Sequence, residues 1–318
     1  MTRTDRIATA GSCFAQRLGR ALRERGLALF DVEPPPAALP PEQHAAFGYG
    51  LYTARYGNLY TTRQLLQLAE QAFGERDPRP IVWTRGARFF DAQRPTVEPE
   101  GLDSPAEVAA HRAWHLDRVR ALFAQMEVFV FTLGMTEAWA DRATGTVFPT
   151  APGVVAGRYD PAESALLQLG FQDVCDELEA FRALLARHRT GPRCRILLTV
   201  SPVPVAATAT DDHVLVAAVG SKATLRAAAT ELRARHADID YLPSFDLVAS
   251  PCNGGLYYNA NRRTITPEGV ARAVALFFDA HGLAAEGAAG LPTAPVERLD
   301  DAPEVCEDAM LDAFAPDR

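Results

Sequence analysis

Two almost uninterrupted apolar runs constrain the fold of this 318-residue chain most strongly. They are Val128–Leu133 and Arg195–Val200. Apart from Arg195 at the start of the second run, their only polar residues are Thr132 and Thr199. A strand that is covered on both faces has such a composition, because neither face meets water. The two runs therefore predict central strands of a parallel sheet.

Shorter strands and amphipathic helices alternate with these runs. Further strands are predicted at Ile7–Ala10, Leu27–Val32 and Ile239–Leu242. Helices are predicted at Phe14–Arg25, near Thr61–Phe73, from Ser104 to about Met126, from Asp160 to about Arg189, at Ser221–His236 and from Thr266 to Phe278, several of them opened by capping residues and proline. This alternation predicts an α/β protein with a three-layer, doubly wound, mostly parallel five-stranded sheet of the flavodoxin-like kind.

One long stretch and the C-terminal end depart from this pattern. Residues from about 34 to 103 lack regular alternation and are expected to form an inserted cap region, since a structureless loop of that length is unusual. Residues 1–283 then form a single domain. Residues 284–318 are rich in Ala, Pro and acidic residues, which predicts a linker or a weakly ordered extension.

Composition excludes several classes of function. A net charge of −8 argues against a nucleic-acid surface. No apolar stretch matches a signal peptide or a membrane span. The five cysteines are scattered, odd in number and without metal-ligand spacing, which predicts reduced thiols in the cytoplasm and no metal site. Glycine-rich phosphate-binding motifs are missing from the sequence as well.

Reactive residue types follow the ends of the predicted strands. Parallel strands end at one edge of a sheet, so these residues are expected to face one crevice. They occur in Gly11-Ser12-Cys13, Gly134-Met135-Thr136-Glu137, Asp211-Asp212-His213, Pro243-Ser244-Phe245-Asp246 and Asn261-Arg262-Arg263-Thr264. A nucleophile, a base, carboxylates and small hydrogen-bond donors are what acyl transfer requires.

Each candidate residue also has a structural alternative. Cys13 at a helix N-terminus is a nucleophilic thiolate or a small buried side chain. Ser12 is a helix N-cap, a nucleophile or an oxyanion donor. His213 is a general base or a surface histidine, while Glu137 and Asp246 are orienting carboxylates or first-turn acids.

The remaining charged candidates are open in the same way. Arg262 and Arg263 would hold an anionic substrate group or point into solvent. Lys222 would point toward the crevice from the start of a helix. His111 and His115 have i, i+4 spacing but no third ligand nearby, which favours a solvated or packed helix face over a metal site.

The motif Gly11-Ser12-Cys13-Phe14-Ala15 resembles the opening motif of the GSCFA-domain family. The resemblance continues through Gly57-Asn58-Leu59-Tyr60, Thr132–Trp139, Thr199–Pro204, Ser221–Arg226 and Tyr241–Phe245, and covers roughly residues 7–280. The family looks like a branch of the SGNH/GDSL esterase superfamily, which implies the same α/β architecture.

The superfamily pattern implies a role for several positions. Its nucleophilic serine falls on Cys13, and its oxyanion glycine falls on Gly57, beside Asn58. Its Gly-x-Asn-Asp block falls on Gly134–Glu137, so that Thr136 replaces the oxyanion asparagine. Its Asp-x-x-His block falls on Asn261–Thr264, where both the acid and the base are missing.

These features predict an enzyme for acyl transfer, either an esterase or an O- or N-acyltransferase. No cofactor is expected, although an acyl thioester such as acyl-CoA or a carrier-bound acyl group would suit a thiol nucleophile. Donor and acceptor would be small molecules or carbohydrates. Two alternatives remain: a non-catalytic ligand-binding protein, and other thiolate chemistry in polysaccharide or natural-product biosynthesis.

Overall fold

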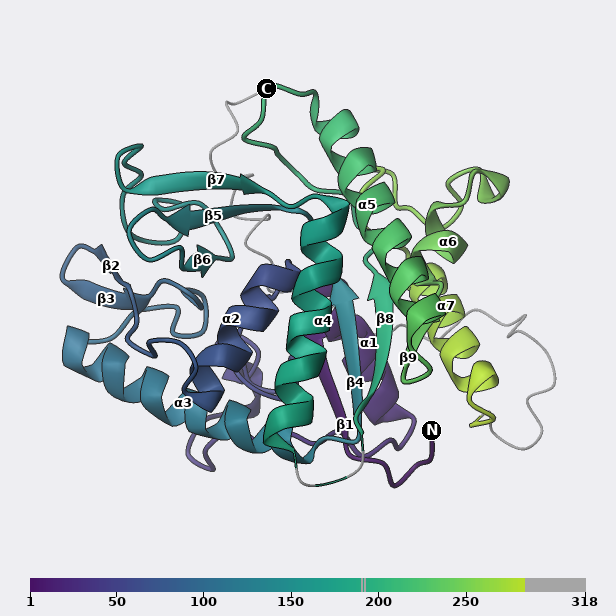
Figure 1. Ribbon diagram of the computed structural model, residues 1–318, viewed down its shortest axis with the longest axis horizontal. Coiled ribbons are helices and arrows are strands. Elements are labelled where there is room, and N and C mark those ends of the chain that lie inside the picture. Colours follow the sequence, from purple (N-terminus) through teal and green to yellow (C-terminus); the bar gives the residue numbers. More distant parts are fainter. Residues whose placement is uncertain (190, 192, 284–318) are drawn as a thin grey trace.

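A parallel four-stranded sheet forms the centre of the protein in a computed structural model, which describes residues 1–189, 191 and 193–283 (Figure 1). The strands β1 (Ile7–Gly11), β4 (Val128–Leu133), β8 (Arg195–Val200) and β9 (Ile239–Leu242) lie in the order β1-β4-β8-β9. All pairs are parallel. The α/β class is therefore confirmed, in an arrangement compatible with a flavodoxin-like fold. The expected extension at 284–318 lies outside the described residues.

The strand expected at Leu27–Val32 is reduced to one isolated bridge between Leu29 and Ile7. Beyond Ile7, other groups occupy this edge of β1. The Thr53 Oγ1 accepts the Thr9 N–H at 3.0 Å, and the Leu59 N–H donates to the Gly11 carbonyl at 3.0 Å. Four strands form instead of five because residues 53–59 take the hydrogen-bonding positions that a fifth strand would use.

Helices cover both faces of the sheet (Figure 1). One face packs against α1 (Cys13–Glu24), α6 (Ser244–Ala249) and α7 (Pro267–Ala280). The opposite face packs against α2 (Thr62–Phe73), α3 (Pro105–Gln125), α4 (Phe171–His188) and α5 (Val214–Arg235). Alternate residues of β4 point into the two cores: Val130 into the first and Phe131 into the second. Burial on both faces explains the apolar composition of these strands.

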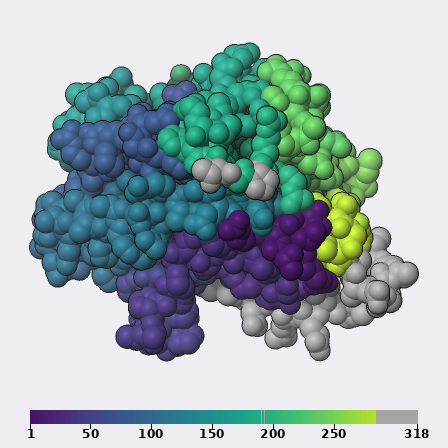
Figure 2. Space-filling model, turned by 60° about the horizontal axis from the view of Figure 1, so that its bottom comes forward, coloured from purple at the N-terminus to yellow at the C-terminus, as the bar shows by residue number. Residues whose placement is uncertain are grey.

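The expected cap at residues 34–103 is divided among three places. Helix α2 was expected near its observed position, and its Leu65 and Leu68 belong to the main core. The hairpin of β2 (Val82–Arg85) and β3 (Arg88–Asp91) packs at the side of the molecule. Only the mostly exposed segment around the short 3₁₀ helix η1 (Pro41–Gln43) projects, as the indigo lobe in Figure 2.

A second small sheet was not expected from the sequence. It contains β5 (Glu137–Asp141), β6 (Val147–Phe148) and β7 (Ser164–Gln168), all antiparallel. The helix predicted from Asp160 is therefore wrong in its first part, because β7 pairs with β5 before α4 begins. The Asp173 carboxylate accepts the Gly170 N–H at 2.8 Å and fixes the true helix start. Near the C-terminal end, the 3₁₀ helix η2 (Pro251–Asn253) precedes α7.

Candidate functional site

The turn from β1 into α1 places Ser12 and Cys13 at the carboxyl edge of the sheet, the end at which the parallel strands finish. Gly11 has a φ of +134°, and a Cβ there would lie 2.3 Å from the Thr132 carbonyl oxygen. Only glycine fits this position. The Ser12 N–H then donates to the Thr132 carbonyl at 3.1 Å, and Cys13 begins the helix. β1 and β4 together thus fix the position of the turn.

Both side chains of the turn are buried. Cys13 is 4% exposed. Ser12 occupies the N-cap position, as expected, but its hydroxyl makes no capping hydrogen bond. Within the described part of the chain, the Ser12 Oγ has no hydrogen-bond partner at all. A buried hydroxyl without a partner is uncommon and points to a place where a further group is accommodated.

Asn58 lies beside this turn, as the sequence predicted. Its Oδ1 accepts hydrogen bonds from the Tyr52 hydroxyl and from Gln16 Nε2 at 3.1 Å. The Tyr52 hydroxyl also lies 3.1 Å from the carbonyl oxygens of Gly11 and Ser12. Gly57, with a φ of +68°, lets the chain turn immediately before Asn58. Two motifs that are 45 residues apart in the sequence (13 and 58) are thereby brought together.

The Gly134–Thr136 turn closes the edge from the β4 side. The N–H groups of Gly134 and Met135 donate to the Tyr60 carbonyl at 2.9 and 3.1 Å. The Thr136 N–H donates to Ser221 Oγ at 2.9 Å. This turn is therefore anchored to the Asn58 segment on one side and to α5 on the other, and its main-chain donors are already engaged.

A narrow cleft of about 10 Å³ lies beside Asn58 and Gln16. Its polar lining residues are all neutral: Gln16, Tyr52, Asn58 and Thr96. The other lining residues are glycine or apolar: Gly48, Leu51, Gly57 and Val97. No cluster of three potential metal ligands occurs in the residues that the structure describes. The cleft suits a neutral polar group such as an amide or a hydroxyl.

His213 and Glu137 lie at the carboxyl edge but make other contacts. His213 is exposed at the N-cap of α5, where its Nδ1 accepts the Leu215 N–H at 3.2 Å. Glu137 accepts the Thr208 hydroxyl at 2.6 Å and the Ala209 N–H at 2.8 Å. Glu137 thus anchors the loop that leads to His213 through two residues of that loop, Thr208 and Ala209.

Asp246, Arg262 and Arg263 lie on the α6–α7 side. Asp246 accepts hydrogen bonds from Tyr241 at 2.6 Å and from Arg226 at 2.8 Å. Burial would raise its pKa, but these two donors hold the pKa of Asp246 below its ordinary value. Arg262, with a φ of +56°, and Arg263 form a turn before α7, in which Asn261 accepts the Arg263 N–H. The Asp246 carboxylate is therefore engaged in linking α6 to Tyr241 of β9 and Arg226 of α5.

A second set of ionisable residues was not recognised as a group in the sequence. We call Glu33, Asp91, Arg94, Arg112 and His115 the buried charge cluster, since all five side chains are buried. Arg94 Nε lies 2.9 Å from Asp91, and Arg112 lies 3.5 Å from the same carboxylate. Glu33 lies 2.7 Å from His115 Nδ1. His115 is thus on a packed helix face, one of the two alternatives that its spacing left open.

Burial and charge set the protonation of this cluster. Burial would raise the pKa of Glu33, but His115 and Arg94 lower it to about 2. Burial lowers the pKa of His115 to about 4, against the opposing effect of Glu33. At neutral pH a neutral His115 therefore donates its Nδ1–H to an ionised Glu33. Among described residues, His115 Nε2 and Glu33 Oε1 have no hydrogen-bond partner.

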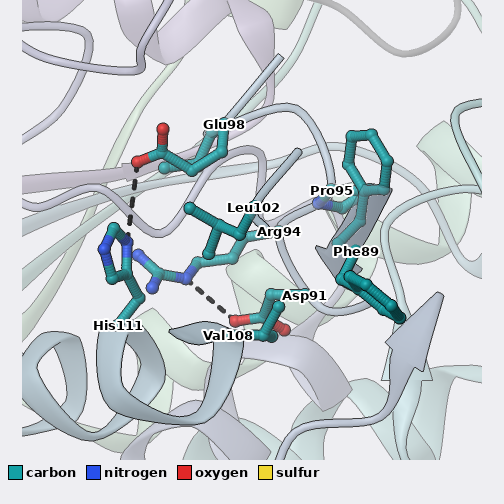
Figure 3. Close-up of a pocket in the computed structure, with 10 residues that line it drawn as sticks. Phe89, Asp91, Arg94, Pro95, Glu98, Leu102, Val108 and His111 are labelled. Atoms are coloured by element: carbon teal, nitrogen blue, oxygen red, sulfur yellow. Dashed lines mark hydrogen bonds and ion pairs between the residues drawn. The ribbon is translucent and has the colours of Figure 1, made fainter. Parts of the chain in front are cut away.

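A shallow pocket lies above this cluster (Figure 3). Asp91 and Arg94 are paired in it, and His111 lies 3.7 Å from Glu98, while Phe89, Leu102 and Val108 supply apolar surface. Each charge in the pocket already has an opposite charge beside it. His111 and His115, one helical turn apart, thus each lie beside a carboxylate, but His111 is half-exposed whereas His115 is buried.

Comparison with known proteins identifies the family of the chain. The model of the GSCFA family matches residues 6–277. Neither the curated proteins nor the solved structures that were searched contain a match. None of the helices in the described residues has the length and apolar character that crossing a membrane requires. Since the match covers most of the sequence, from β1 into α7, the chain belongs to the GSCFA family.

Proposed function

We propose that this protein is an acyl-transfer enzyme of SGNH-like architecture, with Cys13 as its nucleophile and Ser12 as the alternative. One observation carries the proposal: the Cys13 turn and the Asn58 side chain are joined through the Tyr52 hydroxyl. A nucleophile at a helix N-terminus beside a fixed amide is an arrangement suited to attack on a carbonyl group. The missing fifth strand leaves this argument unchanged, because the site lies at the opposite end of β1 from Leu29.

The proposed reaction has two steps. The Cys13 Sγ attacks the acyl carbonyl, and the leaving group departs with a proton, which gives a thioester on Cys13. An acceptor hydroxyl, amine or water then attacks the thioester, loses its proton and regenerates the thiol. Asn58 is held beside the turn, because its Oδ1 accepts hydrogen bonds from Tyr52 and Gln16.

The SGNH acid and base are not supplied by the last helix in this proposal. The Asp-x-x-His-Pro pattern ends in a proline, and the proline that begins α7 is Pro267. This register places the histidine position at Thr266, two residues later than the sequence suggested, and the aspartate position at Arg263. Thr266 caps α7 by accepting the Gly269 N–H at 3.1 Å. With either alignment the pattern lacks its catalytic pair, which favours a thiol over a serine hydroxyl as nucleophile.

The test is acylation by two simple donors, p-nitrophenyl acetate and acetyl-CoA. We expect wild-type protein to gain one acyl group on Cys13 in intact-mass and peptide measurements. Cys13→Ala should lower the acylation rate by about 10³-fold or more, as loss of a nucleophile does. Cys252→Ala, which changes an exposed thiol, is the matched control and should leave the rate unchanged. Full retained turnover in both Cys13→Ala and Ser12→Ala, with normal circular dichroism, would overturn the proposal.

A ligand-binding protein without catalysis is the second candidate. The burial of Cys13 and the neutral polar lining of the cleft favour it. It predicts binding of a small polar ligand at the cleft, with no acyl group transferred to Cys13 by either donor. Asn58→Leu should then abolish binding while thiol chemistry remains absent.

A further inference from the structure

Lys222 brings a buried amine to the carboxyl edge of the sheet. It lies on α5, is 4% exposed, and its Nζ donates to the Gly134 carbonyl at 2.6 Å. The preceding residue, Ser221, accepts the Thr136 N–H. Two consecutive residues of α5 therefore hold the turn that follows β4, and one of them carries a positive charge.

Main-chain hydrogen bonds connect this amine to the nucleophile turn. The Gly134 N–H donates to the Tyr60 carbonyl at 2.9 Å, and the Leu59 N–H donates to the Gly11 carbonyl at 3.0 Å. Leu59 and Tyr60 are adjacent in the chain. This dipeptide is therefore hydrogen-bonded on one side to Gly134, which Lys222 contacts, and on the other side to Gly11, which precedes Ser12. The strand register agrees, because Gly11 pairs with Thr132, two residues before Gly134.

His213, the base proposed from the sequence, is less well placed. His213 lies eight residues before Ser221 on the same helix, which is about 12 Å along the axis. Its Nδ1 is engaged by the Leu215 N–H. Several other ionisable groups on α5 and on the elements packed against it lie in ion pairs: Arg226 with Asp246, Arg233 with Asp240, Arg235 with Glu231, His236 with Glu179, and Glu177 with Arg63.

We propose that the Lys222 ammonium stabilises the Cys13 thiolate and acts as the proton donor and acceptor of the site. The inference rests on the acyl-transfer function proposed above. A nearby cation and a helix N-terminus both favour a thiolate over a thiol, and low polarity strengthens the effect. Lys222 thus takes the proton-transfer role that a histidine has in a serine-based site.

With this assignment, each proton that moves in the two steps has a named donor and acceptor. The thiolate attacks the acyl carbonyl, and the leaving group departs with the Lys222 proton. The neutral amine then takes a proton from the acceptor hydroxyl, amine or water as that group attacks the thioester. Release of the product restores the thiolate and the ammonium, so no further co-reactant is needed.

The test measures the pH dependence of Cys13 alkylation by iodoacetamide, followed on the Cys13 peptide by mass spectrometry. We expect Lys222→Met to slow alkylation about tenfold at pH 7, with the two rates converging at high pH. Lys222→Arg keeps the charge and should restore the rate to within about threefold of wild type. Ser221→Ala removes a neighbouring hydrogen bond without a change of charge and should leave the pH profile unchanged.

Two outcomes would overturn the inference. One is an unchanged pH profile in Lys222→Met, and the other is a Lys222→Arg variant as slow as Lys222→Met. If Lys222→Met does not fold, Lys222→Gln retains a donor for the Gly134 carbonyl and gives the same comparison. The readout needs no substrate, so a failure to acylate Cys13 would count against the proposed function alone.

Discussion

The carboxyl edge of the sheet and the buried charge cluster place polar groups in contrasting ways. At the edge, main-chain hydrogen bonds hold the parts together: Ser12 to Thr132, Leu59 to Gly11, and Gly134 to Tyr60. In the buried charge cluster, side chains hold side chains, and the pKa values of Glu33 and His115 are shifted strongly. The strongly shifted pKa values of Glu33 and His115 therefore belong to a cluster that is separate from the turn of the candidate nucleophile.

We therefore assign buried polar groups two different roles in this protein, one chemical and one structural. Perturbed pKa values often mark active sites, but ion-pair networks shift them as well. The Glu33–His115 pair resembles an acid–base pair, yet Glu33 also accepts the Arg55 N–H, within the segment that leads to Asn58. We infer that the buried charge cluster holds this segment in place, while the chemistry belongs to the edge.

The largest effect is expected for Gly11→Ala, which tests whether main-chain packing defines the edge. The added Cβ would lie 2.3 Å from the Thr132 oxygen, at a φ that other residues rarely adopt. We expect the free energy of unfolding to fall by about 3–6 kcal/mol, from overpacking together with backbone strain. Urea unfolding measures this change.

Gly74→Ala is the matched control for that substitution. Gly74 also has a positive φ, at the end of α2, but nothing lies within 4 Å of an added Cβ. Its loss should be about 1 kcal/mol, the cost of the backbone conformation alone. Equal losses in the two variants would contradict the close packing of β1 against β4.

Arg112→Met is expected to have the next largest effect and tests the buried charge cluster. Arg112 is buried, and it contacts both Asp91 and Gln71. Removing one partner of a buried ion pair costs about 3–5 kcal/mol, because the remaining charge stays buried. Arg79→Met, which breaks an exposed pair with Asp77, should change stability little. If folded Arg112→Met alkylates at Cys13 much faster or slower than wild type, the two regions are not independent.

The same contrast explains what the sequence predicted. The edge depends on short motifs after strands, and parallel topology brings those motifs together, so the sequence predicts Ser12, Cys13 and Gly134 at one edge. Asn58 follows no predicted strand and was indicated only by the resemblance to the SGNH superfamily. The central strands β4 and β8 were predicted from their continuous apolar composition, and a helix was predicted near the position of α2. Position along the chain does not select one base, because α5 and its N-cap carry both His213 and Lys222.

The features that the sequence missed depend on partners far apart in the chain. Arg112 contacts residues 21 and 41 positions away, and His115 contacts Glu33 at a separation of 82. Spacing along one helix cannot indicate such pairs. The short strands β5 and β7 are likewise defined by their pairing, since Ser164–Gln168 has a composition that also suits a helix.

The smallest effect concerns acid sensitivity and tests the protonation of the buried charge cluster. Burial lowers the pKa of His115 to about 4, whereas an unfolded histidine titrates near 6.5. The unfolded chain therefore binds a proton that the folded protein does not, and stability falls as the pH decreases from about 6.5 towards 4. His115→Asn retains a donor for Glu33 but cannot titrate, so its free energy of unfolding should fall less over this range. Urea unfolding at several pH values gives the slopes, with His111→Asn, which changes a half-exposed histidine one turn earlier, as the control. A His115→Asn slope equal to that of wild type would mean that His115 binds its proton at the same pH in the folded and the unfolded chain, and the electrostatic contrast between the two regions would then be lost.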